Sequence, residues 1–124
     1  MQIYVGGMYQ GKLAYVLQHT EGLTVTDGAV CTVDEALSAQ ILHHFHLFVR
    51  RLMEKHLPVS TFVDRLCSEN PDCIVICDEV GCGVVPTHAF ERKYRETVGR
   101  CCCRIAAKSD TVVRVTCGVG QRIK

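Results

Sequence analysis

A glycine-rich stretch near the start of the chain has the residue types and the spacing of a phosphate-binding loop. Its residues are Gly6, Gly7, Met8, Tyr9, Gln10, Gly11, Lys12 and Leu13. Glycines let the backbone curl so that successive N–H groups point at one anion, and a lysine at the start of the next helix reaches the outer phosphates. We therefore predict that this stretch binds a nucleotide and that Lys12 is catalytic.

The position after the lysine departs from the usual pattern. A serine or threonine there ligates magnesium through its hydroxyl, whereas this chain has Leu13. We predict that Asp27 and Asp78 hold Mg²⁺ instead, because each follows a predicted strand and ligands bind at the carboxyl ends of parallel strands. For Asp27, a turn residue that bonds its own backbone is the alternative.

Two acids follow the most apolar run of the chain. Residues 73–77 read Cys-Ile-Val-Ile-Cys, which is typical of a strand buried on both faces of a parallel sheet. Asp78 and Glu79 come directly after it, as P-loop proteins place carboxylates near magnesium or substrate. We predict a catalytic role for Glu79, with an ordinary turn as the alternative. Residues 81–86 then form a glycine-punctuated loop.

The elements that must position these residues alternate between strands and helices, which predicts an α/β fold. We expect residues 1–124 to form a single P-loop (RecA-like) nucleotide-binding domain, a mostly parallel sheet with helices on both faces. Thr32 and Glu35 fit a capping box. The apolar spacing after them predicts one long helix through Leu52, with His43 on its solvent side and His44 and His46 on its flanks.

Composition excludes several classes of protein. A net charge of +1 argues against a nucleic-acid binder, and no apolar run is long enough to span a membrane. We see no signal-like N-terminus and expect a cytoplasmic protein, in which the nine cysteines would be reduced thiols. A cysteine-rich metal or redox module is the alternative that this count suggests.

The second half of the chain, together with the glycine loop, resembles the adenosylcobinamide kinase/adenosylcobinamide-phosphate guanylyltransferase family. The residues that carry the resemblance are Glu79–Pro86, Arg92, Tyr94–Glu96, Gly99-Arg100, Ala106-Ala107, Asp110, Gly118–Gly120 and Ile123-Lys124, with Gly6-Gly7 and Gly11-Lys12. The sequence differs from the family pattern at Leu13, at Asp78 where asparagine is typical, and at Cys102-Cys103 where an Asn-Gln pair is expected.

The resemblance implies an enzyme of cobalamin assembly and salvage. Such enzymes use Mg²⁺ and ATP or GTP to phosphorylate the aminopropanol hydroxyl of adenosylcobinamide, and then transfer GMP from GTP through a histidine-bound intermediate. The family's middle region, which bears that histidine, is compressed here into residues 27–70. The resemblance therefore implies that His44 or His46 carries the nucleotide.

The sequence is also compatible with two further interpretations. Leu13 and the compressed middle region also fit a nucleotide-binding protein that has lost catalysis and acts as a sensor or partner subunit. An edge strand near the C-terminus would also allow a homo-oligomer, although nothing in the sequence fixes its symmetry.

Overall fold

The computed structural model of the chain describes residues 1–81, 83 and 87–124. Four residues of the predicted glycine-punctuated loop, Cys82 and Val84–Pro86, lie outside the described residues. In chain order the elements are β1 (Gln2–Gly6), α1 (Lys12–His19), β2 (Val25–Asp27), α2 (Val33–Leu37), β3 (Ile41–His43), α3 (Phe45–Glu54), α4 (Val59–Glu69), β4 (Ile74–Asp78), α5 (Ala89–Lys108), β5 (Thr111–Thr116) and β6 (Val119–Arg122).

The strands form one sheet in the order β2-β3-β4-β1-β5-β6. All neighbouring pairs are parallel except β5 and β6, which are antiparallel. This confirms the predicted α/β fold with a mostly parallel sheet. Because β1 lies directly beside β4 with Gly6 opposite Asp78, the glycine loop and the acids leave the sheet at the same edge.

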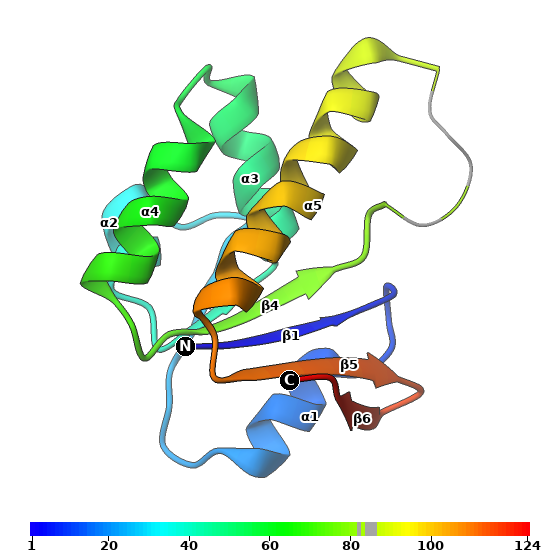
Figure 1. Cartoon of the computed structure of the whole chain (residues 1–124). Coiled ribbons are helices and arrows are strands. Elements are labelled where there is room, and N and C mark those ends of the chain that lie inside the picture. Colours follow the sequence, from blue (N-terminus) through cyan, green and yellow to red (C-terminus); the bar gives the residue numbers. More distant parts are fainter. Residues whose placement is uncertain (82, 84–86) are drawn as a thin grey trace.

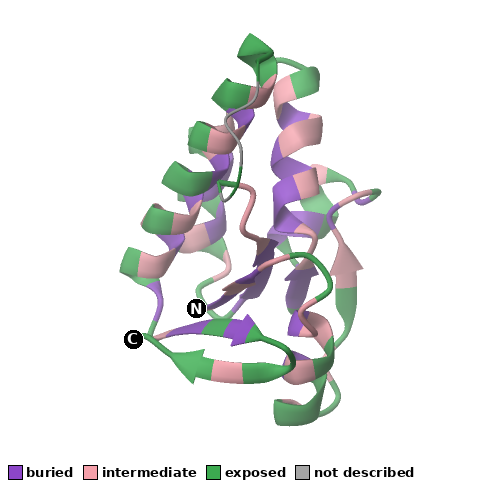
Figure 2. Cartoon of the chain, turned by 90° about the vertical axis from the view of Figure 1, so that its right-hand side faces the viewer, coloured by how far each residue is buried: buried purple, intermediate pink, exposed green. Residues whose placement is uncertain are grey.

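Helices cover both faces of the sheet, as predicted, but the coverage is unequal. In Figure 1, α1 lies below the sheet, and α3, α4 and α5 lie above it. Val16 of α1 packs with Tyr4, Ile76 and Val115 in the smaller apolar cluster. The larger cluster joins the opposite side chains of the strands to α2–α5, and Figure 2 shows the buried strands between these layers. Alternation of side chains along the strands produces these two clusters.

The prediction of one long helix from Thr32 to Leu52 was wrong. The capping box itself is present, since the Thr32 hydroxyl accepts from the Glu35 N–H at 3.1 Å and the Glu35 carboxylate accepts from the Thr32 N–H at 3.2 Å. The helix ends at Leu37, however, and β3 follows.

The apolar residues that suggested a continuous helix belong to a buried strand. Ile41 and Leu42 are fully buried, on opposite faces of the sheet. They pair with β2 and β4, so backbone hydrogen bonds to two neighbours replace those of a helix. The chain then turns at His44, whose φ of 55° interrupts the strand before α3 begins.

The longest described helix, α5, has 20 residues and carries charged side chains along its length. No helix within the described ranges is long and apolar enough to cross a membrane.

Replacement of Gly6 by alanine tests the close approach of β1 to β5. A Cβ at Gly6 would lie 2.3 Å from the Val115 carbonyl oxygen, which belongs to the sheet backbone and has little freedom to move. We expect Gly6→Ala to lower the free energy of unfolding by about 2–3 kcal/mol in urea titrations. Gly7→Ala is the matched control, because its Cβ would meet only the Gln10 side chain, at 3.5 Å. Equal stability of the two variants would contradict this account.

Candidate functional site

The predicted phosphate loop joins β1 to α1 and is fastened to the turn between β5 and β6. The carbonyl oxygen of Gln10 accepts from the Gly118 N–H at 2.8 Å, and its side-chain oxygen accepts from the Cys117 N–H at 2.7 Å. Gly11 precedes α1 with a φ of 85°, a conformation that favours glycine. The order of strand, glycine turn and helix is therefore the one that the sequence predicted.

Lys12, the first residue of α1, points back across the loop toward β4. Its side chain is 4% exposed, and its Nζ lies 2.6 Å from Asp78 Oδ1. The same ammonium donates to the Gly7 carbonyl oxygen at 2.7 Å. A buried ammonium requires such partners, because transfer out of water is costly for an unpaired charge. The lysine and the acid that the sequence predicted separately are thus in direct contact.

Asp78 also contacts His46, at the start of α3. Asp78 Oδ2 lies 3.4 Å from His46 Nε2, and the Asp78 N–H donates to His46 Nδ1 at 3.3 Å. Burial lowers the pKa of His46, an effect that Asp78 partly opposes. A neutral ring whose Nδ1 accepts carries its proton on Nε2, toward the carboxylate. His46 is therefore a buried partner of Asp78 with both ring nitrogens engaged.

A cavity of about 280 Å³ lies beside this ion pair. It is lined by the loop from Met8 to Ala14 and by His43, His44 and Asp78. Most of the predicted nucleotide-binding residues therefore surround one cavity. Gly6 and Gly7 form the start of the same loop, whereas Asp27, His46 and Glu79 do not line this cavity.

Asp27 is both a turn residue and a partner of His44. Its Oδ1 accepts from the Ala29 N–H at 2.9 Å, which is the bond expected of a turn, and lies 2.9 Å from His44 Nδ1. Burial alone would raise the pKa of Asp27, but the bonds from Ala29 and His44 outweigh it and lower the pKa. With Nδ1 bound to Asp27, His44 presents its other nitrogen, Nε2, for chemistry.

His43 is a member of the cavity that sequence reasoning missed. The helical spacing places its side chain on the solvent side of a helix, but His43 ends β3, and the centroid of its ring lies 3.7 Å from that of His44. Burial, reinforced by His44, lowers the pKa of His43 to about 4. Its Nδ1 is buried without a hydrogen-bond partner among the described residues. The feature that could have identified His43 as a site residue is its position at the carboxyl end of a strand.

Glu79 lies beside Asp78 in sequence but has different partners. Its N–H donates to the Gly6 carbonyl oxygen at 2.9 Å, and its carboxylate accepts from Arg114 of β5 at 3.2 Å. Glu79 is therefore held at the same edge of the sheet, at the end of β1.

The donor set at the cavity fits Mg²⁺ bound together with nucleotide phosphates. Such an ion needs only one or two carboxylates, because water and phosphate oxygens complete its coordination. Asp78 is the carboxylate that lines the cavity, whereas Leu13 supplies no oxygen from its side chain. Within the described ranges, no group of three or more His, Cys, Asp or Glu residues is arranged to hold a metal by itself.

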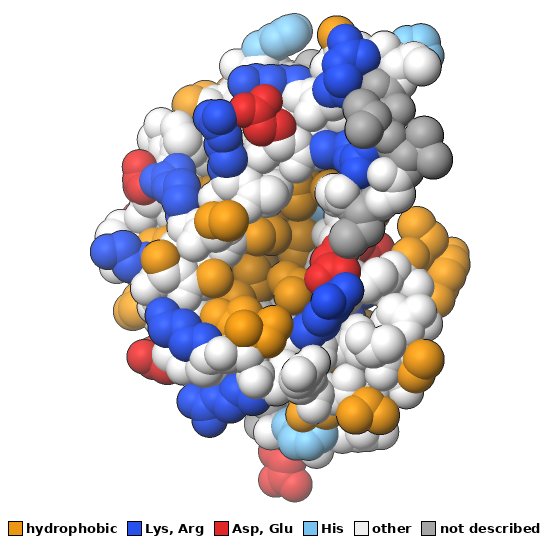
Figure 3. Space-filling model, turned by 45° about the vertical axis from the view of Figure 1, so that its right-hand side comes forward, with side chains coloured by type: hydrophobic (Ala, Val, Ile, Leu, Met, Phe, Trp, Pro, Cys, Tyr) orange, Lys and Arg blue, Asp and Glu red, His pale blue; other side chains and the backbone are white. Residues whose placement is uncertain are grey.

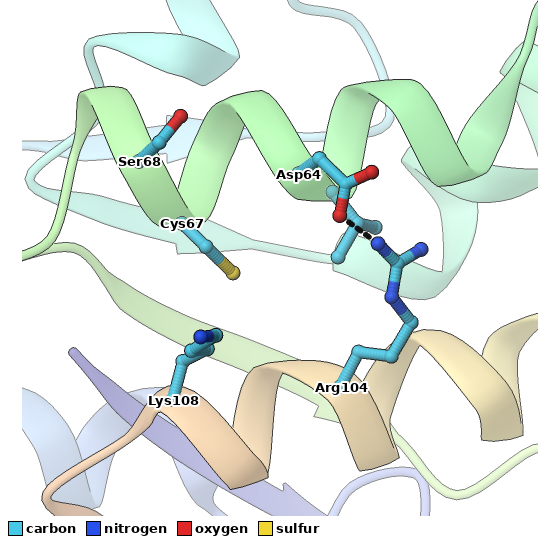
Figure 4. A pocket seen from close by; sticks show the side chains of 6 residues that line it. Asp64, Cys67, Ser68, Arg104 and Lys108 are labelled. Atoms are coloured by element: carbon cyan, nitrogen blue, oxygen red, sulfur yellow. Dashed lines mark hydrogen bonds and ion pairs between the residues drawn. The ribbon is translucent and has the colours of Figure 1, made fainter.

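Another cavity, of about 330 Å³, lies between α4 and α5. Figure 4 shows Arg104 ion-paired with Asp64 on one side of it, and Cys67 facing Lys108 on the other. It includes no residue of the glycine loop or of the strand ends. We therefore place the candidate site at the cavity beside Lys12.

Comparison with known proteins supports the family resemblance. The model of the family described as cobinamide kinase / cobinamide phosphate guanyltransferase matches residues 10–123. The chain belongs to this family. The match includes Gly11, Lys12, His44, Asp78 and Glu79 and begins after Tyr9.

A curated relative is the bifunctional adenosylcobalamin biosynthesis protein CobU of Salmonella typhimurium. It is 39% identical over 51 residues, which is 41% of this chain and 28% of the relative. The aligned part thus covers little more than a quarter of the relative's length.

Removal of the Lys12 charge tests its pairing with Asp78. Lys12→Met leaves the carboxylate of Asp78, 15% exposed, without its cation, so we expect a loss of about 2–4 kcal/mol in the free energy of unfolding. Adding Asp78→Asn should restore part of this loss, because it removes the unpaired charge. Arg65→Met is the control, since its pair with Glu69 is exposed to solvent and should contribute little to the free energy of unfolding. A Lys12→Met variant as stable as the control would contradict the assignment.

The low pKa of His43 predicts a loss of stability in mild acid. The unfolded chain protonates this ring near pH 6.5 and the folded chain only near pH 4, so protons favour unfolding between these values. Above pH 6.5 the effect is absent. We expect a loss of about 1 kcal/mol at pH 5, a value reduced because the ring is only half-buried.

His43→Gln should reduce this loss between pH 7 and pH 5 in urea titrations, and His46 should account for some of the remainder, because its pKa is also lowered. The exposed His88 provides the control variant His88→Gln, which should keep the wild-type pH dependence. An unchanged pH dependence in His43→Gln would overturn the prediction.

Proposed function

We propose that this chain is a cytoplasmic transferase of cobalamin assembly that phosphorylates the hydroxyl of adenosylcobinamide with ATP or GTP. The observation that carries the proposal is the ammonium of Lys12, held 2.6 Å from Asp78 at a glycine loop in a member of this family. Phosphoryl transfer depends mainly on positioning and on neutralisation of phosphate charge. A buried lysine, a carboxylate and a helix N-terminus at one cavity supply both.

The proposed step is an exchange of one phosphorus–oxygen bond for another. The hydroxyl oxygen of the acceptor bonds to the γ-phosphorus, the bond from that phosphorus to the β–γ bridging oxygen breaks, and the nucleoside diphosphate leaves. Lys12 binds the outer phosphates, Asp78 holds Mg²⁺, and Glu79 accepts the hydroxyl proton. When bound, Mg²⁺ neutralises phosphate charge.

For GMP transfer, His44 is the better of the two predicted carriers. Its side chain is 36% exposed and it lines the cavity, whereas His46 is 8% exposed and both of its nitrogens contact Asp78. The bond to Asp27 orients the His44 ring as an acid orients a catalytic histidine. Nε2 would bond to the α-phosphorus of GTP as pyrophosphate leaves. The phosphate of adenosylcobinamide phosphate would then take the GMP and release the ring.

A second candidate is a nucleotide-binding protein without turnover. The observation that favours it is Leu13, which lines the cavity and packs against the smaller apolar cluster, where a hydroxyl would ligate magnesium. Under this alternative the protein binds GTP or ATP and acts as a sensor or partner subunit. Restoration of activity by Leu13→Ser would place the defect at the metal.

The kinase proposal is tested by incubating the protein with adenosylcobinamide, Mg²⁺ and γ-labelled ATP or GTP. We expect labelled adenosylcobinamide phosphate, and a loss of at least about a hundredfold in kcat/KM for Lys12→Ala. Arg65→Ala, at an exposed pair, should retain the wild-type rate. Nucleotide binding by calorimetry without any product would favour the second candidate, and an absence of binding would overturn both.

The proposed role of His44 as the carrier of GMP is tested with GTP that is labelled at its α-phosphate. We expect a protein-bound label that is stable to alkali and lost in acid, as a phosphoramidate is, and that is absent from His44→Asn. Asparagine is chosen because it tolerates the positive φ of 55° at this position. A label that persists in His44→Asn and disappears in a His46 variant would assign the role to His46 instead.

A further inference from the structure

A second cavity adjoins the candidate site on the other side of the end of β4. It has a volume of about 280 Å³, and Asp78 borders both cavities. Its walls are the apolar side chains of Val5, Val80, Val98 and Cys102. We call it the apolar cavity. Figure 3 shows a hollow with a hydrophobic floor, bordered by acidic and basic side chains.

The two acids at the end of β4 differ in the cavities that they border, because Asp78 borders both and Glu79 borders only the apolar cavity. Side chains alternate along a strand, and the carboxylate of Asp78 accordingly meets Lys12 of α1, whereas Glu79 meets Arg114 on the α5 side. Glu79 lines the apolar cavity and does not line the cavity beside the glycine loop. One polar and one apolar cavity thus meet at adjacent carboxylates.

This arrangement suits a transfer between two unlike molecules. The cavity beside the glycine loop has the lysine and histidines that recognise phosphates, whereas the apolar cavity offers hydrocarbon surface with a carboxylate at one end. Ligand cavities commonly combine apolar walls with a few polar groups that fix orientation. Its volume is close to the lower limit of about 300 Å³ typical of ligand sites, which suits a short aliphatic group.

We propose that the apolar cavity receives the hydroxyl-bearing aliphatic arm of the phosphate acceptor. The methyl and methylene groups of the arm contact Val5, Val98 and Cys102, and the hydroxyl lies at Glu79, beside the phosphates bound on the other side of Asp78. The bulk of the acceptor stays outside the cavity. This inference rests on the proposed kinase function and adds the position of its second substrate.

Gly99 of α5 offers a way to fill the cavity without disturbing the fold. It lines the cavity, and a Cβ built there meets no described atom within 4 Å. Replacement of an interior helix glycine by a residue of higher helix propensity stabilises the helix. Gly99→Leu should therefore occupy the space while the protein remains folded, and Gly99→Ala should occupy only part of it.

The test measures the KM for the acceptor and the Kd for the nucleotide separately. We expect Gly99→Leu to raise KM for adenosylcobinamide by at least about tenfold, with a smaller rise for Gly99→Ala, and to leave the Kd for a non-hydrolysable nucleotide within about twofold. Ala107→Leu is the control, because this exposed residue lies two turns further along α5 and outside the cavity. Its KM should match that of the wild type.

A direct measurement of adenosylcobinamide binding tests the acceptor site independently of the kinase proposal. Binding of adenosylcobinamide is measured by equilibrium dialysis in the presence of the non-hydrolysable nucleotide, and the bound amount is quantified from its visible absorbance. Binding by the wild type that Gly99→Leu loses supports the acceptor site even if no phosphate is transferred. A stably folded Gly99→Leu with wild-type KM, or with wild-type binding, overturns the acceptor site and leaves the kinase proposal intact. No binding by the wild type overturns the acceptor site as well.

Discussion

The contact between Lys12 and Asp78 is the interaction on which the candidate site depends. It joins the first residue of α1 to the last residue of β4, and it exists because β1 lies beside β4 with Gly6 opposite Asp78. A buried ammonium and a largely buried carboxylate stabilise the fold only while they remain together. An incoming phosphate offers Lys12 a new anionic partner, so nucleotide binding would leave Asp78 available for a cation. The pair thus links the stability of the fold to the chemistry that we propose.

The histidines around this pair differ in environment more than in sequence position. His46 is buried against Asp78, His43 is half-buried with a pKa near 4, and His44 is oriented by Asp27. Burial disfavours the charged form of an imidazole and lowers the pKa of both His43 and His46. The turn at His44, with its positive φ, brings these rings together.

The end of β4 gives the site two unlike sides. Asp78 turns toward the glycine loop and Glu79 toward α5, because consecutive side chains of a strand point in opposite directions. One strand end can therefore serve a charged ligand and an apolar one at the same time. Two adjacent cavities thus lie at one edge of the sheet.

Much of the site was determined by local sequence. The glycine spacing before Lys12, the apolar run before Asp78 and the capping box at Thr32 each depend on neighbouring residues, and the structure contains all three. Local sequence did not determine β3. Ile41 and Leu42 fit a helix by spacing, and only pairing with β2 and β4 makes them a strand. That pairing also placed His43 and His44 at the cavity, because strand partners distant in sequence decide which residues reach the edge of a sheet. The same physical reason separates Asp78 from Glu79, since the elements that face each acid come from distant parts of the chain.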